Sequence, residues 1–179
     1  MTKISLLTIF LCGSIPALWS QKPPETLTEF EKKYQRNIRQ EYLYGVYIPK
    51  DLADAFVQLN RKIDEESRAK FTALPDTIAA DKLFFSLGRW IIYNWNFYEG
   101  SRFSHYLHNL GIHHPDDMAR FVIITYHRNL RRQPLQVKEL IEHFQKLREA
   151  ERLRRLQKGT VLYKEVHKRP KPDSLHNEN

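Results

Sequence analysis

The densest group of metal-binding residue types in the chain is the run His-His-Pro-Asp-Asp at residues 113–117. Histidine nitrogens and aspartate oxygens bind zinc and other divalent ions when several of them converge on one point. His127 is a further candidate ligand, at the far end of the helix expected after this run. One functional hypothesis is therefore a metal-dependent hydrolase that uses His114, Asp116, Asp117 and His127. The chain contains no His-Glu-x-x-His segment, so the spacing matches no strong zinc signature.

The same run is also typical of the start of a helix. His114 fits the N-cap position, and proline is favoured at the first helical position, where Pro115 stands. Asp116 and Asp117 then place negative charge in the first turn, where it complements the helix dipole. We therefore interpret residues 114–117 first as a helix start, and only second as a metal site or a catalytic acid or base.

An aromatic segment precedes this run and suggests a binding groove. Residues 90–98 read Trp-Ile-Ile-Tyr-Asn-Trp-Asn-Phe-Tyr, and an arginine follows at position 102. An arginine beside tryptophans can hold a carboxylate or phosphate, or stack on a ring. The alternative is a core helix end whose Trp and Tyr polar atoms need partners. The residues expected to form a ligand or partner groove are Trp90, Trp95, Tyr98, Arg102, His114, Asp117, His127 and Arg128.

Complete catalytic signatures are missing from the sequence. No serine lies in a Gly-x-Ser-x-Gly setting, and no glycine-rich loop could hold a phosphate. No catalytic residue and no cofactor is therefore assigned. The leading hypothesis is a non-catalytic binding module for a protein or an envelope component, and the metal-dependent hydrolase is the alternative.

The N-terminal segment is typical of a cleavable secretory signal. Lys3 supplies positive charge before the apolar run from Ile4 to Leu11, which is shorter than the roughly 20 residues that span a bilayer. We expect cleavage after Ser20, with Ala17 as an alternative site, and a periplasmic or extracellular location. The alternative is an uncleaved N-terminal anchor. Cleavage after Ser20 also removes Cys12, the only cysteine, and so excludes thiol catalysis.

The formal net charge of +8 is concentrated near the C-terminus. Residues 146–171 hold ten basic and three acidic side chains, whereas residues 21–145 hold 18 basic and 16 acidic ones. A basic helix can bind an anionic surface, so a membrane-surface protein is a further hypothesis. Nucleic acid is an unlikely partner for an exported chain.

The hydrophobic spacing predicts an all-α, compact single domain of five or six helices. Helices are expected over about 26–38, 51–63, 76–95, 101–110, 115–126 and 137–157, with Asp76 capping the third, which we expect to be the most buried. Residues 42–48 are interpreted as an extended segment. The resulting domains are a signal peptide (1–20), an N-terminal helix and linker (21–46), a helical domain (47–145) and a basic C-terminal extension (146–179), helical at first and then disordered.

Several short motifs resemble a known family. They are Ile-Pro-Lys-Asp-Leu at 48–52, Leu-Phe-Phe-Ser-Leu-Gly-Arg-Trp at 83–90, Asn-Trp at 94–95, Gly-Ser-Arg at 100–102, Leu-Gly-Ile at 110–112, His-Pro-Asp-Asp-Met at 114–118 and Tyr-His-Arg at 126–128. Together they resemble an uncharacterised bacterial domain family, domain of unknown function 6794, over roughly residues 47–144. The resemblance implies a small helical domain. It supplies no catalytic residue, because the family has no established activity.

Overall fold

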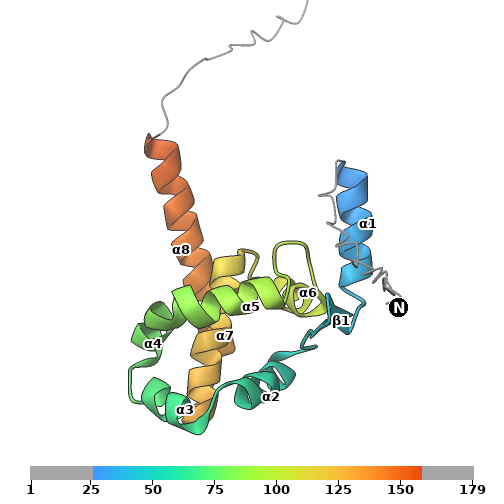
Figure 1. Cartoon of the computed structure of the whole chain (residues 1–179). Helices are drawn as coiled ribbons and strands as arrows, with labels where there is room; N and C mark the ends of the chain where they lie inside the picture. The colour runs from blue at the N-terminus through green and yellow to red at the C-terminus, as the bar shows by residue number, and fades with distance from the viewer. Residues whose placement is uncertain (1–25, 159–179) are drawn as a thin grey trace, which may run out of the picture.

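The computed structural model describes residues 26–158, which are mainly helical. The elements in chain order are α1 (Leu27–Asn37), β1 (Tyr42–Leu43), β2 (Val46–Tyr47), α2 (Leu52–Lys62), α3 (Glu65–Thr72), α4 (Asp76–Leu83), the π-helix η1 (Phe84–Gly88), α5 (Arg89–Asn94), α6 (Arg102–Asn109), α7 (Pro115–Leu130) and α8 (Val137–Lys158). Because α4, η1 and α5 follow one another without a gap, these residues contain seven helical segments (Figure 1). The predicted helical fold is confirmed, but the number of helices was set too low. The predicted signal peptide and the end of the C-terminal extension lie outside the described residues.

A two-stranded antiparallel sheet corrects the all-α prediction. Tyr42 pairs with Tyr47 and Leu43 pairs with Val46. Tyr44 and Gly45, between the strands, have φ angles of 50° and 79°, as a two-residue hairpin turn with positive φ at both positions requires. The aromatic residues of this segment were recognised as strand-like, but the Tyr-Gly turn that closes the hairpin was missed.

The helix missed by the sequence analysis is α3. Ile63 has an extended backbone and ends α2, and Asp64 then caps α3 by accepting a hydrogen bond from the Ser67 amide. The predicted helix bounds, 51–63 and 76–95, place no helix at the acidic residues after Ile63. These acidic residues are instead the first turn of a new helix, where negative charge is favourable.

Helix α7 forms the centre of the fold, which corrects the prediction that residues 76–95 would be the most buried. It packs against α2, α3, α4, η1, α5, α6 and α8 (Figure 1). Most of its middle residues, from Asp117 to His127, are buried. By contrast, Phe85 and Tyr93 on the segment 76–95 are 78% and 65% exposed, so this apolar segment is covered on one side only.

Local capping signals place most helix starts correctly. Asp51 caps α2, Ser101 caps α6 and His114 caps α7, each accepting a hydrogen bond from an amide in the first turn. Gly111 follows α6 with a φ of +96°, as expected of a left-handed residue at a helix end. Asp76 is an exception: Pro75 occupies the N-cap, and Asp76 is the first helical residue.

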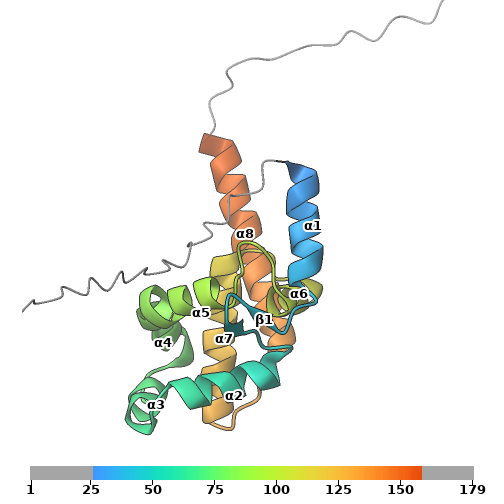
Figure 2. The same cartoon turned by 45° about the vertical axis from the view of Figure 1, so that its right-hand side comes forward.

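The first and last helices project from the body on the same side (Figure 2). Helix α1 is attached near its C-terminal end, where Lys33 pairs with Glu99 at 2.8 Å and the Tyr34 hydroxyl lies 3.2 Å from His105 Nδ1. Helix α8 buries Leu140 and Phe144 near its start, whereas Leu153 and Leu156 are largely exposed. The expected boundary between residues 145 and 146 falls inside α8.

A glycine under the Tyr34 ring allows α1 to attach where it does. Gly100 has a φ of +88°, and a Cβ atom there would overlap the Tyr34 ring. Gly45 has a similar φ of +79°, with no atom near the position of an added Cβ. We expect Gly45→Ala to lower the free energy of unfolding by about 1 kcal/mol, the penalty for left-handed backbone. Gly100→Ala should cost about 1 kcal/mol more, because Tyr34 must also leave its histidine partners. Urea unfolding of both variants tests this, and equal losses would contradict it.

Candidate functional site

A groove lies between α2, α3, α4, η1 and α5. Its volume is about 590 Å³, within the range of roughly 300–1,000 Å³ typical of small-molecule sites. It is lined by Lys62, Ile63, Ser67, Lys70, Phe71, Leu74, Lys82, Leu83, Ser86, Leu87 and Trp90. Except for the buried Phe71, its apolar side chains are only partly buried, and they pack against the hydrophobic core.

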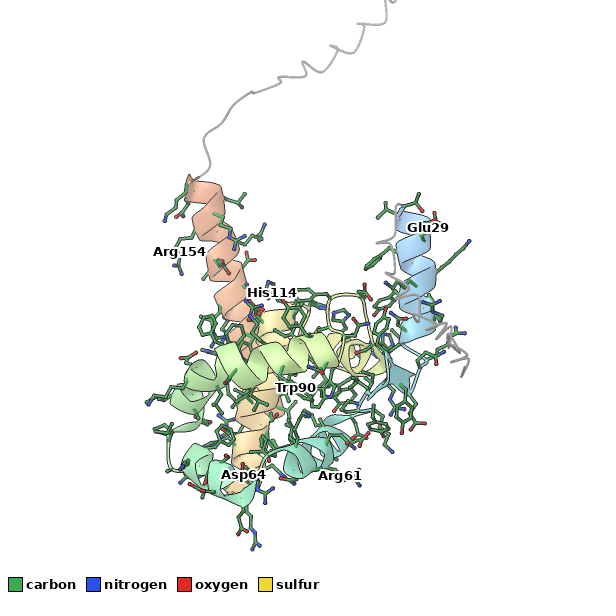
Figure 3. All side chains as sticks on the ribbon, viewed as in Figure 1. Glu29, Arg61, Asp64, Trp90, His114 and Arg154 are labelled. Atoms are coloured by element: carbon green, nitrogen blue, oxygen red, sulfur yellow. The ribbon has the colours of Figure 1, made fainter. Side chains whose placement is uncertain are left out.

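The surplus apolar face of the segment 76–95 forms one wall of this groove. Leu83, Leu87 and Trp90 recur at helical spacing and line it together. Trp90 projects from the side of α5 that faces α2 (Figure 3). The wall includes the π-helix η1, and π-helical turns inside α-helices occur frequently at functional sites. The many apolar residues of the segment 76–95 led to the prediction that it is the most buried helix. Leu83, Leu87 and Trp90 of this segment instead line the groove.

The residues that line the groove carry a net positive charge. Three of its lining residues are lysines, and none is an aspartate or a glutamate. The lysines come from three helices: Lys62 from α2, Lys70 from α3 and Lys82 from α4. Lys62 Nζ lies 4.5 Å from the centre of the Trp90 ring, within the range of a cation–π contact. The groove thus combines an apolar interior with a cationic edge.

The groove has few polar groups besides its lysines. Its hydroxyl groups belong to Ser67 and Ser86, and no histidine or carboxylate lines it beside them. Ser67 Oγ donates to Asp64, which caps α3, and Ser86 Oγ donates to the Leu83 carbonyl. Both hydroxyls therefore already donate to acceptors within the fold.

The residues predicted to form a groove lie in several separate places. Trp95 is 1% exposed and belongs to the core, whereas Trp90 reaches the groove described above. Tyr98 is 51% exposed, and its hydroxyl accepts a hydrogen bond from Arg89. Arg102 donates from Nε to the Ile48 carbonyl at 2.7 Å.

His127 and Arg128, near the end of α7, have local structural partners. His127 is 1% exposed, its Nε2 lies 2.9 Å from the Leu74 carbonyl oxygen, and its ring packs edge-on against Phe71. Arg128 pairs with Asp76 at 2.7 Å and also donates to the Leu135 carbonyl. Burial tends to raise the pKa of Asp76, but hydrogen bonds from Arg128 and the Thr77 amide lower it overall.

His114 and Asp117 are brought together, and the residue that joins them is Arg148 of α8. Arg148 donates from Nε and Nη2 to the two Asp117 carboxylate oxygens, at 2.5 and 2.7 Å. Its Nη2 also lies 3.0 Å from His114 Nδ1, which accepts from the Asp116 amide. Figure 3 places His114 close to the base of α8. Arg148 was not among the predicted site residues, because the predicted basic extension begins at residue 146.

The predicted metal ligands do not converge. Within residues 26–158, no three His, Cys, Asp or Glu side chains are arranged to hold a metal ion. Asp117 binds the Arg148 guanidinium, and His127 lies against Leu74. Asp116 lies 3.8 Å from Arg89. Of the four residues of the hydrolase hypothesis, His114 and Asp117 share Arg148 as a partner, whereas Asp116 and His127 lie against other groups.

A cluster of histidines beside α1 should make stability depend on pH. Burial lowers the pKa of His108 below its ordinary value of 6.5, and charge on His113 lowers it further. As the pH falls through 6.5, the unfolded chain takes up this proton before the folded chain does. We therefore expect the free energy of unfolding to fall between about pH 7.5 and pH 5.5, and less steeply in His108→Gln. Urea unfolding at both pH values measures this, with His143→Gln, an exposed site on α8, as the control. Equal slopes for His108→Gln and the wild type would contradict the prediction.

None of the helices in residues 26–158 is long and apolar enough to cross a bilayer. No curated protein and no solved structure matches the chain significantly. A family model does match, and it covers α2 to α7 and all the residues that line the groove. The resemblance expected from the short motifs is thereby confirmed: residues 48–130 match the family described as Domain of unknown function (DUF6794).

Proposed function

We propose that the protein is a non-catalytic binding module that takes an elongated apolar or amphiphilic ligand into the groove between α2, α3, α4, η1 and α5. The observation that carries this proposal is the set of partly exposed apolar side chains around a hollow of about 590 Å³. Each Å² of apolar surface that a ligand covers contributes about 25 cal/mol.

The location of the groove supports the proposal. Its lining lies entirely within residues 62–90, inside the segment that matches the family. It also lies on rigid elements, since five helical elements supply most of the side chains. We further propose that the protein acts outside the cytoplasm, as residues 1–20 predict, so that an envelope component is a suitable ligand.

A fluorescence titration tests the proposal. An uncharged naphthylamine fluorophore, whose emission rises in apolar surroundings, should bind the wild-type protein and change the emission of Trp90. Leu87→Arg should weaken binding by about tenfold or more, because the ligand would bury an unpaired charge.

Phe85→Arg provides the matched control. Phe85 lies on the same π-helix, is 78% exposed and does not line the groove. Its replacement should leave the affinity unchanged. No binding to the wild type, or equal loss in both variants, would refute the assignment of the groove.

A further inference from the structure

We propose that the ligand of the groove is a single-chain amphiphile with a carboxylate head, the chemical class of the fatty acids. This inference rests on the binding function proposed above and specifies its ligand. The groove holds two features that such a molecule needs, an apolar interior for the alkyl chain and positive charge for the head group.

The charge of the groove selects an anion. Lys62, Lys70 and Lys82 line the groove from three different helices, and no acidic residue is part of the lining. Within the described residues Lys82 makes no ion pair. Lys70 pairs with Glu66 at 2.6 Å, but the two side chains are 75% and 78% exposed. Such an exposed pair is weak, so Lys70 remains available to an incoming carboxylate.

The interior of the groove suits an alkyl chain. Apart from the lysines, its polar groups are the hydroxyls of Ser67 and Ser86, which bind Asp64 and the Leu83 carbonyl. None of the residues that line the groove has a buried donor or acceptor without a partner, so the middle of the ligand needs no polar group. A ligand with one apolar chain and one charged end therefore leaves no buried polar atom without a partner.

Calorimetric titration with dodecanoate, dodecanol and dodecylammonium, below their aggregation concentrations, tests the head group. We expect dodecanoate to bind about tenfold more tightly than dodecanol, and dodecylammonium to bind most weakly. Near 1 M salt the preference for dodecanoate should shrink, because the Debye length falls to about 3 Å.

Two matched triple variants assign this preference to the groove. Replacing Lys62, Lys70 and Lys82 by glutamine should abolish the preference for dodecanoate over dodecanol. Replacing Lys32, Lys138 and Lys146 removes the same charge from exposed positions outside the groove, and should leave the preference intact. Circular dichroism checks that both variants fold.

A series of carboxylates with alkyl chains of different length tests whether the alkyl chain lies in the groove. From octanoate to decanoate to dodecanoate, the affinity should rise about fourfold for each CH₂ group that the groove covers. A flat series would overturn the placement of the chain in the groove.

The outcomes separate this inference from the binding function. If the naphthylamine binds but dodecanoate and dodecanol bind equally, the preference for a carboxylate head group is refuted. The proposed apolar binding site is then retained. If neither the naphthylamine nor any amphiphile binds, both proposals fail. A dimer in solution that Leu87→Arg dissociates would show a second copy in the groove, and would overturn the amphiphile.

Discussion

Replacing Trp95 by alanine should lower the free energy of unfolding by about 3–5 kcal/mol, the usual range for removing a buried aromatic side chain. Trp95 is 1% exposed, and its ring packs edge-on against Phe103, with ring centres 5.2 Å apart, and against Trp90, at 5.8 Å. Alanine would leave a cavity that the surrounding α7 core cannot fill without moving. Chemical denaturation followed by circular dichroism measures the loss.

Trp90 is the matched comparison, because it contacts Trp95 but also lines the groove. Trp90→Ala should cost less stability, about 1–2 kcal/mol, since part of its ring is already in contact with water. It should weaken binding of the naphthylamine in protein that remains folded, whereas Trp95→Phe should retain binding. Similar stability losses at the two tryptophans would contradict this division between core and groove.

The two tryptophans illustrate what the sequence could and could not predict. Their spacing on one apolar segment correctly indicated a helix, but it did not show which face meets α7. That choice depends on residues far along the chain, on α2 and α3 on one side and on α7 on the other. Hydrophobic spacing identifies an apolar face, and only the packing decides whether that face is covered.

Signals that act within one helical turn were the reliable ones. Asp51, Ser101 and His114 start helices, because each side chain needs only a nearby amide to cap. The helix start at His114 also explains most of the His-Pro-Asp-Asp run without a metal. The start of α3 at Asp64 carries a similar local signal, Asp-x-x-Ser, which was not among the predicted helix starts.

The number of basic residues in α8 is a poor measure of how much positive charge the helix leaves unpaired. Residues 146–158 carry six basic side chains and two acidic ones. Three of the arginines nevertheless pair with acids: Arg148 with Asp117 and Glu151, Arg152 with Glu149, and Arg155 with Glu151. The basic surface available to an anionic partner is therefore smaller than the count of basic side chains suggests. The sequence also could not reveal that Arg148 reaches back to α7, because its partner lies 31 residues away.

Arg148→Met should consequently destabilise the attachment of α8 by about 2–3 kcal/mol. The reason is an asymmetry of exposure. The Asp117 side chain is 11% exposed and the Arg148 side chain is 36% exposed. Removing the arginine leaves a nearly buried carboxylate with only the start of α7 to stabilise it. In Asp117→Asn, by contrast, the Arg148 side chain can reorient toward the solvent. Asp117→Asn should therefore cost less, about 1–2 kcal/mol.

A double-mutant cycle separates the pair from its surroundings. If the bidentate contact carries the effect, the double variant should lose clearly less than the sum of the two single losses. Arg152→Met, one turn further along α8, is the control: its side chain is 63% exposed and pairs with Glu149, so its loss should stay below about 0.5 kcal/mol. Hydrogen exchange should then show faster opening of α8 in Arg148→Met and not in Arg152→Met, because only the first variant removes a contact to α7. Additive losses, or equal exchange in the two variants, would mean that Leu140 and Phe144 alone hold α8 to the body.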